Sequence, residues 1–470
     1  MTAVVRPGAA GDEPLAQAFL RDALESARTR AASGAWAIIT LPAPCGEPLA
    51  LWDAATADEA WLWQEPQAAW SESAVGDMMT GEPPPASDLR AAIQDGWSRA
   101  SRFVHPSIDA APVPRAFGGM CFDADAPVEP VWQSFGHARF LVPRWRFVRI
   151  ADSATLTLCV RTRELDHAGV DLALREHRRL SRRLAAYARP PADRAHVSAV
   201  EHLSLDDWTG LVIGAREEVR SGRFTKLVAA RRSRIALHRP IDAEPVLAAL
   251  LRDQRDVTVF GLRLAGATFL GASPETLVAR SGQHVRTEAL AGTAPGTDDD
   301  VERLLASAKD RHEQAIVVDE IAERLRSVCA RVDVPRQPHA HRLRHVTHLR
   351  TPIEAELAAP LHVLDLVRLL HPTPAVAGLP RDAAMRWIAT HERSPRGWYA
   401  GPVGWFDQHG DGRFIVGIRS ALLAGKEAFV FAGAGIVAAS EPSAEYDETG
   451  WKLRAMISAL LADEDRRLAW

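Results

Sequence analysis

The sequence predicts an α+β fold, and two observations support this prediction. Strand-like hairpins recur in the second half of the chain, and two long helical patterns interrupt them without the regular strand–helix–strand rhythm of a doubly wound sheet. Apolar residues make up 47% and charged residues 25% of the 470 residues, which is ordinary for globular proteins. This composition argues against a disordered chain, a collagen or a coiled coil.

The charge balance points to small molecules as partners. Lys and Arg number 56 against 60 Asp and Glu, a formal charge of -4, so we expect neither nucleic-acid nor membrane binding. The four cysteines lie far apart and predict no disulfide framework and no zinc site: Cys45, Cys121, Cys159 and Cys329. No export signal and no apolar run long enough to span a membrane is visible, so the expected location is the cytoplasm.

Three hairpins are expected in the second half of the chain. Their strands are residues 257–264 with 267–270, residues 275–279 with 284–290, and residues 414–423 with 428–432. The first part, residues 1–195, mixes Trp-rich segments with strand-like runs such as residues 154–160. A passage rich in proline and arginine, residues 187–194, separates it from residues 196–470.

The two helical patterns span residues 298–329 and 441–466. Thr297 or Asp298 is a possible cap for the first, and Ser440 is the expected N-cap of the second, with Pro442 in its first turn. Strand 428–432 runs into Gly433-Ala-Gly435, which we expect to be a glycine turn before the second helix. Such a turn either binds an anion through its backbone N–H groups or merely links the two elements.

Both helices carry carboxylates at helical spacing. Asp310 and Glu313 are three residues apart, as are Glu445 and Glu448, and Lys452 follows four residues after Glu448. Oxygen ligands of this kind suit a hard ion such as magnesium. The alternative, two solvated helix faces with ion pairs, is commoner for an isolated pair.

Two further residues have patterns compatible with acid–base chemistry. Lys226 lies within an apolar run, where burial would lower its pKa, although most such lysines extend their ammonium to water. Glu275 follows a Ser-Pro turn and is either a turn carboxylate or an acid kept protonated by burial. The residues alone leave both alternatives open.

Taken as an ordered set, the motifs resemble those of the chorismate-utilising enzymes. The set comprises K-L-V-A-A-R from Lys226, S-P-E at Glu275, A-L-A-G-T up to Thr293, K-D-R-H-E up to Glu313, H-L-R-T from His348, H-P-T-P-A-V-A-G-L-P across Ala375, G-W-Y-x-G-P-V-G around Tyr399, G-I-R-S around Arg419, A-G-A-G up to Gly435 and the run from Glu445 to Lys452. The resemblance covers residues 200–460. Within the family, the motifs are most similar to those of the isochorismate synthase branch.

This resemblance implies a fold like that of anthranilate synthase component I, in which two large, mostly antiparallel sheets pack together with helices outside. Residues 1–195 are then expected to add strands to the same body, and the protein is expected to be a monomer. It also implies Mg²⁺ as the cofactor and chorismate as the substrate. In this reading Glu313 and Glu448 hold the metal, and Asp310 and Glu445 lie behind them or bind through water.

The resemblance also implies the catalytic roles. Lys226 is expected to be the general base that activates water, and Glu275 the general acid that protonates the departing hydroxyl. The expected substrate contacts are the enolpyruvyl carboxylate at Tyr399 and Arg419, a second carboxylate at the backbone of Gly433 and Gly435, and the remaining wall at Gly292, Thr293, His348 and Lys452.

Two positions bear on the subtype. Relatives that add ammonia lack a lysine at the position of Lys226. Salicylate-forming relatives have what looks like a threonine at the position of Ala375, whereas alanine there resembles enzymes that stop at isochorismate. The expected activity is therefore reversible isomerisation of chorismate to isochorismate, for menaquinone or else for a siderophore. The alternatives are a salicylate synthase and an inactive chorismate-binding protein. Gly296 and Gln314 depart from the family pattern, which affects only details of the loop.

Overall fold

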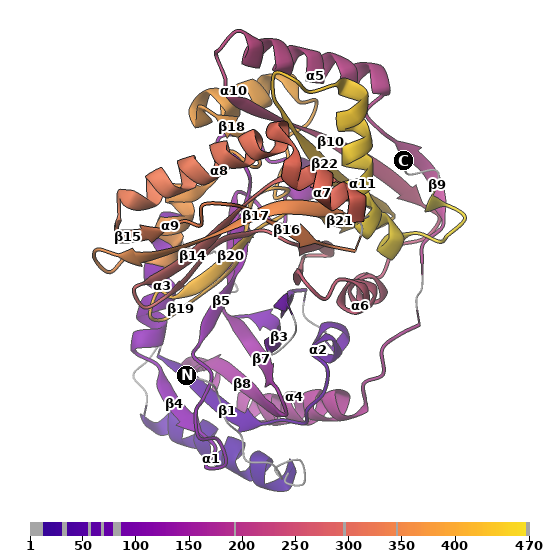
Figure 1. Cartoon of the computed structure of the whole chain (residues 1–470). Coiled ribbons are helices and arrows are strands. Elements are labelled where there is room, and N and C mark those ends of the chain that lie inside the picture. The colour runs from indigo at the N-terminus through magenta and orange to yellow at the C-terminus, as the bar shows by residue number, and fades with distance from the viewer. Residues whose placement is uncertain are drawn as a thin grey trace.

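The computed structural model describes residues 13–30, 35–54, 58–66, 70–78, 86–191, 194–294, 298–344 and 346–466. Within this part of the chain the strands form a 13-stranded sheet and a 9-stranded sheet, and helices lie around them (Figure 1). The α+β prediction with two large sheets is confirmed.

The larger sheet joins strands from both ends of the chain. Its members are β1 (Trp36–Pro42), β2 (Ala60–Gln64), β3 (Trp70–Asp77), β4 (Ser101–Val104), β7 (Pro143–Ile150), β8 (Ser153–Arg161), β9 (Val197–Glu201), β10 (Lys226–Leu237), β11 (Thr258–Leu264), β12 (Ala267–Ser273), β18 (Gly378–Leu379), β21 (Ser420–Ala424) and β22 (Glu427–Ile436). The order is β18-β10-β22-β21-β12-β11-β2-β3-β7-β8-β1-β4, with β9 beside β10. Of the pairs described, β1 with β4 is the parallel one.

The smaller sheet packs against the larger one. Its strands are β5 (Arg115–Met120), β6 (Ala138–Leu141), β13 (Thr276–Ser281), β14 (His284–Ala294), β15 (Cys329–Asp333), β16 (His339–Arg342), β17 (Thr347–Leu357), β19 (Pro402–Asp407) and β20 (Gly412–Val416). Its order is β15-β17-β14-β13-β20-β19-β5-β6, with β16 beside β17. Strands from residues 1–195 thus belong to both sheets.

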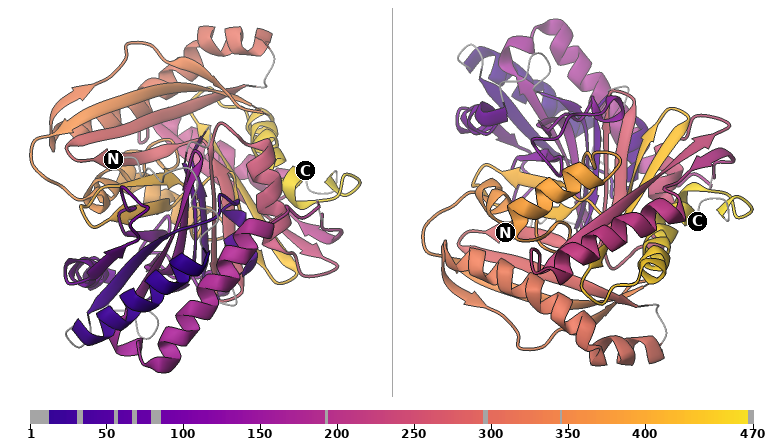
Figure 2. Two further views of the ribbon diagram at one scale, coloured as in Figure 1. Left: turned by 90° about the horizontal axis from the view of Figure 1, so that it is seen from below. Right: turned by 90° about the horizontal axis from the view of Figure 1, so that it is seen from above.

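Helices cover the outer faces of both sheets. They are α1 (Glu13–Arg30), α2 (Leu49–Ala54), α3 (Ala86–Ser98), α4 (His167–Ala186), α5 (Leu205–Arg220), α6 (Ala243–Asp253), α7 (Asp298–Ala306), α8 (Ala308–Arg326), α9 (Val363–Leu370), α10 (Arg381–His391) and α11 (Pro442–Leu460). The views along the vertical axis show α1 and α4 together outside the N-terminal strands, and α8 outside the smaller sheet (Figure 2). No helix in the described ranges is long and apolar enough to cross a membrane.

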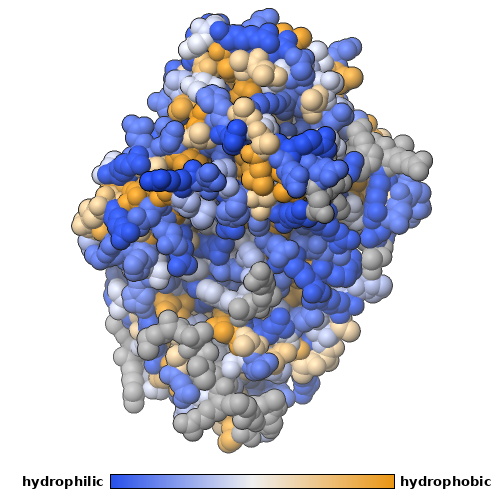
Figure 3. Space-filling model, in the orientation of Figure 1, coloured by the Kyte–Doolittle hydropathy of each residue, from blue (hydrophilic) through white to orange (hydrophobic). Residues whose placement is uncertain are grey.

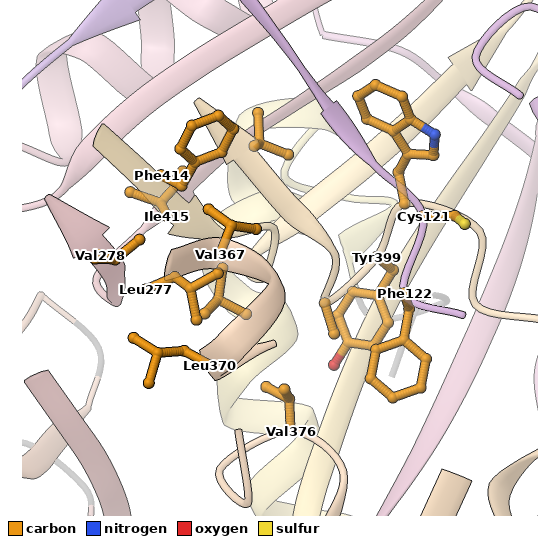
Figure 4. Packing of buried hydrophobic residues seen from close by; sticks show 14 of the residues in the cluster. Cys121, Phe122, Leu277, Val278, Val367, Leu370, Val376, Tyr399, Phe414 and Ile415 are labelled. Atoms are coloured by element: carbon orange, nitrogen blue, oxygen red, sulfur yellow. The ribbon is translucent and has the colours of Figure 1, made fainter. Parts of the chain in front are cut away.

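Alternating side chains of the strands fill two cores. In β11, Phe260 belongs to the core that includes Phe406 and Phe414 of the smaller sheet, whereas its neighbour Val259 belongs to the core that includes Leu247 of α6. This division follows from the two-residue period of a strand, because central strands of the large sheet such as β11 and β12 are buried on both faces. Figure 4 shows the first core where α9 packs against β13 and β20. On the face shown in Figure 3, hydrophilic residues dominate and hydrophobic residues form small groups.

The chain passes from one sheet to the other twice at the same place. It leaves β12 after Ser273 and enters β13 at Thr276, and it leaves β20 after Val416 and enters β21 at Ser420. The two crossings are bonded to each other: Ala272 N donates to Arg419 O at 3.0 Å, and Val416 N donates to Glu275 O at 3.0 Å. This arrangement places Glu275 and Arg419 side by side at the junction of the sheets.

Four local predictions are wrong in detail. The expected strand 414–423 is two strands in different sheets, because the backbone turns at Arg419, where φ is 50°. The expected helix 298–329 is divided into α7 and α8 at Ser307, whose hydroxyl accepts from Asp310 N and caps α8. The chain after Arg326 then turns into β15. Thr297 and Gly296 lie outside the described residues.

The other two errors concern the last helix and the strand before it. Helix α11 ends at Leu460, and its N-cap is Glu441; the Ser440 hydroxyl instead accepts from Val437 N. Gly433 and Gly435 form no turn, since both lie within strand β22. The hairpins β11/β12, β13/β14 and β21/β22 are confirmed.

Candidate active site

A cavity between the start of β10, the sheet junction and helices α8 and α11 contains most of the predicted site. It is lined by both predicted catalytic residues, by every predicted substrate residue and by two of the four predicted metal ligands: Lys226, Glu275, Gly292, Thr293, His348, Ala375, Tyr399, Arg419, Gly433, Gly435, Lys452, Glu313 and Glu448. Residues from positions 226 to 452 therefore meet in one place.

Lys226 is the first residue of β10, and its side chain is 1% exposed. Its Nζ lies 2.9 Å from Oε1 of Glu313 on α8. Burial raises the pKa of Glu313, but Lys226 and two further lysines outweigh this effect, so the pKa is lowered overall. Only a neutral amine can accept a proton, so a role as general base requires Lys226 to give up both its ion pair with Glu313 and its ammonium proton.

Glu275 is a buried carboxyl at the junction of the sheets. Burial and the negative charge of Glu288 raise its pKa to about 8, although Lys226 and Lys452 oppose this shift. Glu288 is held close by, because its Oε1 accepts from Thr276 N at 2.6 Å and its Oε2 pairs with Arg350. Around neutral pH, Glu275 therefore keeps its proton and can donate it.

Arg419 is a buried cation whose guanidinium bonds to a histidine. Its Nη2 donates to Nε2 of His348 at 2.8 Å, and His348 Nδ1 donates to Gly292 O at 3.0 Å. These bonds fix the neutral tautomer of His348, whose pKa burial lowers well below its usual value. Burial also lowers the pKa of Arg419, to about 10. A buried guanidinium of this kind is suited to bind a substrate carboxylate.

The glycines of β22 make room in the cavity. A Cβ on Gly435 would lie 2.3 Å from Oε1 of Glu313 and 2.8 Å from Cε of Lys226, and a Cβ on Gly433 would lie 3.2 Å from the hydroxyl of Tyr399. Their function here is to let charged groups approach the strand closely, and no helix N-terminus is involved. Across the cavity, the ring of Tyr399 stacks on Phe431 with centroids 5.0 Å apart.

Lysines pair with three of the four predicted metal carboxylates. Besides the Lys226–Glu313 pair, Lys452 Nζ lies 2.6 Å from Glu448, and Lys309 Nζ lies 3.1 Å from Glu445. Burial raises the pKa of Glu445, and the adjacent Glu448 adds to this shift. The carboxylates on α8 and α11 thus act on one another and on the same lysines. A positive charge near them stabilises their ionised form.

The arrangement suits a magnesium site completed by substrate. In the described residues, no group of three or more His, Cys, Asp or Glu side chains stands close enough to hold a metal ion. Glu313 and Glu448 do line the cavity, whereas Asp310 lies behind it, against Gly292, and Glu445 bonds to Lys309. Magnesium is commonly bound by one or two carboxylates together with substrate oxygens, so two lining carboxylates fit this ion.

Sequence reasoning missed several lining residues. Arg396, Val228, Val376 and Phe431 also face the cavity, and Glu288 acts on Glu275 from behind. The signal for Arg396 was present: it lies four residues after Glu392 and directly before the motif that begins at Gly397.

The departure at Gln314 is accommodated, because its Nε2 donates to Ala289 O and Thr351 Oγ1.

Comparison with known proteins shows which family the chain resembles. Residues 22–461 match the family described as "Chorismate binding enzyme". The isochorismate synthase MenF of Bacillus subtilis is 36% identical over 353 residues, which are 74% of this chain and 74% of the relative. The salicylate biosynthesis isochorismate synthase of Pseudomonas aeruginosa is 37% identical over 414 residues, or 85% of this chain and 84% of the relative.

Solved structures agree with these matches. The menaquinone-specific isochorismate synthase MenF from Escherichia coli superposes with a TM-score of 0.77 at 28% identity, covering 94% of this chain and 100% of that chain. Anthranilate synthase component I from Streptococcus pneumoniae shares the fold, with a TM-score of 0.62 at 23% identity, over 74% of this chain and 81% of that chain. The chain belongs to the family of chorismate-binding enzymes.

Proposed function

We propose that the protein is an isochorismate synthase that converts chorismate reversibly to isochorismate with Mg²⁺. The observation that carries this proposal is the meeting of Lys226, Glu275 and Arg419 in one cavity that two carboxylates also line. The similarity to isochorismate synthases over most of the chain supports it. The reaction adds water to the ring of chorismate and expels its hydroxyl as water.

Lys226 and Glu275 divide the proton transfers between them. As a neutral amine, after it has released both Glu313 and its ammonium proton, Lys226 accepts a proton from the attacking water, and Glu275 donates its proton to the departing hydroxyl. In the reverse direction the same two groups exchange roles. The seclusion of both side chains keeps solvent from competing for these protons.

The remaining groups bind and orient the substrate. Arg419 and Tyr399 contact one carboxylate, and His348 holds the guanidinium of Arg419 in place. When bound at Glu313 and Glu448, Mg²⁺ would neutralise and orient a substrate carboxylate. Asp310 and Glu445 support these two ligands from behind.

Product analysis tests the proposal. Purified protein incubated with chorismate and Mg²⁺ should form isochorismate, and incubation of isochorismate should return chorismate. Salicylate with pyruvate would identify a salicylate synthase, and anthranilate formed with ammonia would identify an amino-adding enzyme. Tight binding of chorismate without any product would identify an inactive binding protein. Any of these three results would refute the proposal.

The pH profile should report the state of Glu275. Because the acid must be protonated, activity should be retained below its pKa of about 8 and should fall as the pH rises beyond it. In Glu288→Gln, loss of the neighbouring negative charge should lower the pKa of Glu275 and move this fall to lower pH. Initial rates measured between pH 6 and about 10 would show the shift. The exposed Glu354→Gln serves as a control and should leave the profile unchanged.

Glu448→Gln should weaken the dependence on Mg²⁺. The change removes the charge of one of two lining carboxylates, so the Mg²⁺ concentration for half-maximal activity should rise at least about tenfold. Loss of a residue that only supports a metal ligand already weakens metal binding by about this factor. Titration with Mn²⁺ followed by electron paramagnetic resonance measures the affinity directly. Glu441→Gln, at the N-cap of the same helix but 67% exposed, should behave like wild type. Equal affinities in all three proteins would exclude Glu448 as a ligand.

The cellular context belongs to the proposal as well. We expect a cytoplasmic monomer that acts on chorismate and binds no nucleic acid. We propose menaquinone synthesis as the route for the product, because a menaquinone-specific isochorismate synthase matches the chain, and a siderophore pathway as the alternative. Genes adjacent to the coding sequence would distinguish the two.

A further inference from the structure

A buried glutamate–arginine pair lies between the candidate active site and a second cavity. Glu392 follows α10 directly, and Arg396 lies four residues later; their side chains are 6% and 3% exposed. Arg396 Nη2 contacts Glu392 Oε1 at 2.5 Å, and Arg396 Nε donates to Oε2 at 2.9 Å. Two parallel bonds of this kind fix the plane of the guanidinium.

The pair is bonded to the strand that carries Lys226. Arg396 Nη2 donates to Val228 O at 3.0 Å, and Glu392 Oε1 accepts from Ala230 N at 2.9 Å. Val228 and Ala230 lie two and four residues after Lys226, so their side chains share its face of β10. Along this edge β10 pairs with β18 at Lys226 and Leu227, and with β9 from Arg234 onward. The pair occupies the gap between these two neighbours.

The same arginine is bonded to the loop that carries Ala375. Its Nη1 donates to Val376 O at 2.6 Å, and its guanidinium lies over the ring of Phe122, 4.3 Å from the centroid. Figure 4 labels Phe122, Tyr399 and Val376, which belong to the same buried core. The guanidinium of Arg396 therefore contacts strand β10, the loop that carries Ala375, and Phe122 from the first 195 residues.

The pair also separates two cavities. Arg396, Tyr399 and Phe431 line the candidate active site on one side and, on the other, a cavity of about 380 Å³ at the outer edge of β10. Glu392 lines only the outer cavity. The wall between the two cavities thus depends on side chains that the pair holds in place.

We propose that Glu392 and Arg396 form a positioning unit for isomerisation, holding Lys226 in register with the Ala375 loop and closing the active site toward the outer cavity. This inference rests on the proposed function for its catalytic part. Neither residue transfers a proton in this scheme; both act through the strand and the loop that they bond. A displacement of about 1 Å at a reacting group can lower the rate roughly a hundredfold, so loss of the pair should appear mainly in kcat.

Glu392→Gln tests the proposal, with Glu320→Gln as a matched control. Glu320 pairs with Arg324 at the same spacing on α8, and Arg324 likewise donates to a backbone carbonyl, that of Leu369, away from the cavity. We expect Glu392→Gln to lower kcat about 10- to 100-fold with little change in the KM for chorismate, and Glu320→Gln to stay near wild type. Arg396→Lys, which keeps the charge without the planar fork, should also lose kcat.

Amide hydrogen exchange gives a readout that does not depend on turnover. The Ala230 amide donates to Glu392, so its exchange should accelerate at least about tenfold in Glu392→Ala, which removes the acceptor altogether, while amides in α8 stay protected. Faster exchange at Ala230 with wild-type kcat would overturn the positioning role, and unchanged exchange would overturn the contact itself. Failure of the wild-type protein to form isochorismate would instead overturn the proposed function, because the exchange result stands without it.

Discussion

Replacing Lys226 with alanine should lower turnover by about 10²- to 10⁴-fold, the usual contribution of a general base. The side chain is 1% exposed and lies in the cavity that also contains Glu275, so bulk solvent does not substitute for it easily. Affinity for chorismate should stay close to that of wild type, because Arg419 and Tyr399 provide the carboxylate contacts. Initial rates and calorimetric titration of chorismate measure the two effects separately.

The control for this change is Lys426→Ala, an exposed lysine in the turn between β21 and β22. Lys226→Ala leaves Glu313 without its partner, which can reduce stability, so Lys226→Met and a thermal denaturation curve should accompany it. Folded Lys226→Ala or Lys226→Met protein with near-normal turnover would show that another group is the base.

Removing Glu72 should destabilise the protein by about 3–5 kcal/mol, as expected when one partner of a buried ion pair is lost. Glu72 lies on β3 and is fully buried; its Oε1 accepts from Arg115 at 2.7 Å, and its Oε2 accepts from Arg146 Nε at 2.7 Å. Arg115 comes from β5 of the other sheet, and its guanidinium lies between the rings of Trp70 and Trp405, 3.6 and 3.3 Å from their centroids. Glu72→Ala removes the carboxylate that pairs with both buried guanidinium groups.

Chemical denaturation of Glu72→Ala measures this loss. Glu354→Ala is the matched control, since Glu354 faces Arg286 on the surface with 68% of its side chain exposed and should change stability by no more than about 1 kcal/mol. A loss below that level in Glu72→Ala would mean that the two arginines find other partners. Burial lowers the pKa of Arg115 to about 9, which is the expected direction for a cation held between two rings inside the protein.

Local signals in the sequence were sufficient for the hairpins. Turn residues such as Ala265-Gly266 and Ala424-Gly425-Lys426 stand between runs of alternating residues, and β11/β12 and β21/β22 pair as these signals indicate. The division of the first long helix also had a local signal, because Ser307 followed three residues later by Asp310 is a typical N-cap sequence. This signal was outweighed by the continuous helical pattern around it.

Contacts between distant segments could not be inferred from such signals. Residues 414–423 are mostly apolar, and the chain changes sheets within them at Arg419; the interruption by Arg419 and Ser420 does not by itself indicate that the two halves belong to different sheets. Gly433 and Gly435 were interpreted as a turn because glycine is common there, whereas their real constraint is the approach of Glu313 and Tyr399 from other elements. The pairing of β2 with β11 likewise depends on residues about two hundred positions apart.

The residues predicted for the candidate site lie together in one cavity, but the sequence contained little information about their contacts with one another. Resemblance to a family supplied Lys226, Glu275 and Arg419, and the structure brings them into one cavity. It gave no indication that Lys226 and Glu313, assigned to different tasks, are bonded to each other. Such a pair becomes visible only when β10 and α8 are placed in space.

The paired crossings between the sheets have a mechanical consequence. Glu275 and Arg419 lie in two adjacent connections between the sheets, and backbone hydrogen bonds join these connections at both ends. If one sheet bends relative to the other, the proton donor and the carboxylate-binding residue therefore move together. In the described part of the chain, Lys226 on β10 is linked to this junction through the strand pairs β10/β22 and β22/β21. Movement of one sheet relative to the other would therefore change the distance between Lys226 and a ligand bound at Arg419. It would leave the position of Glu275 relative to that ligand unchanged.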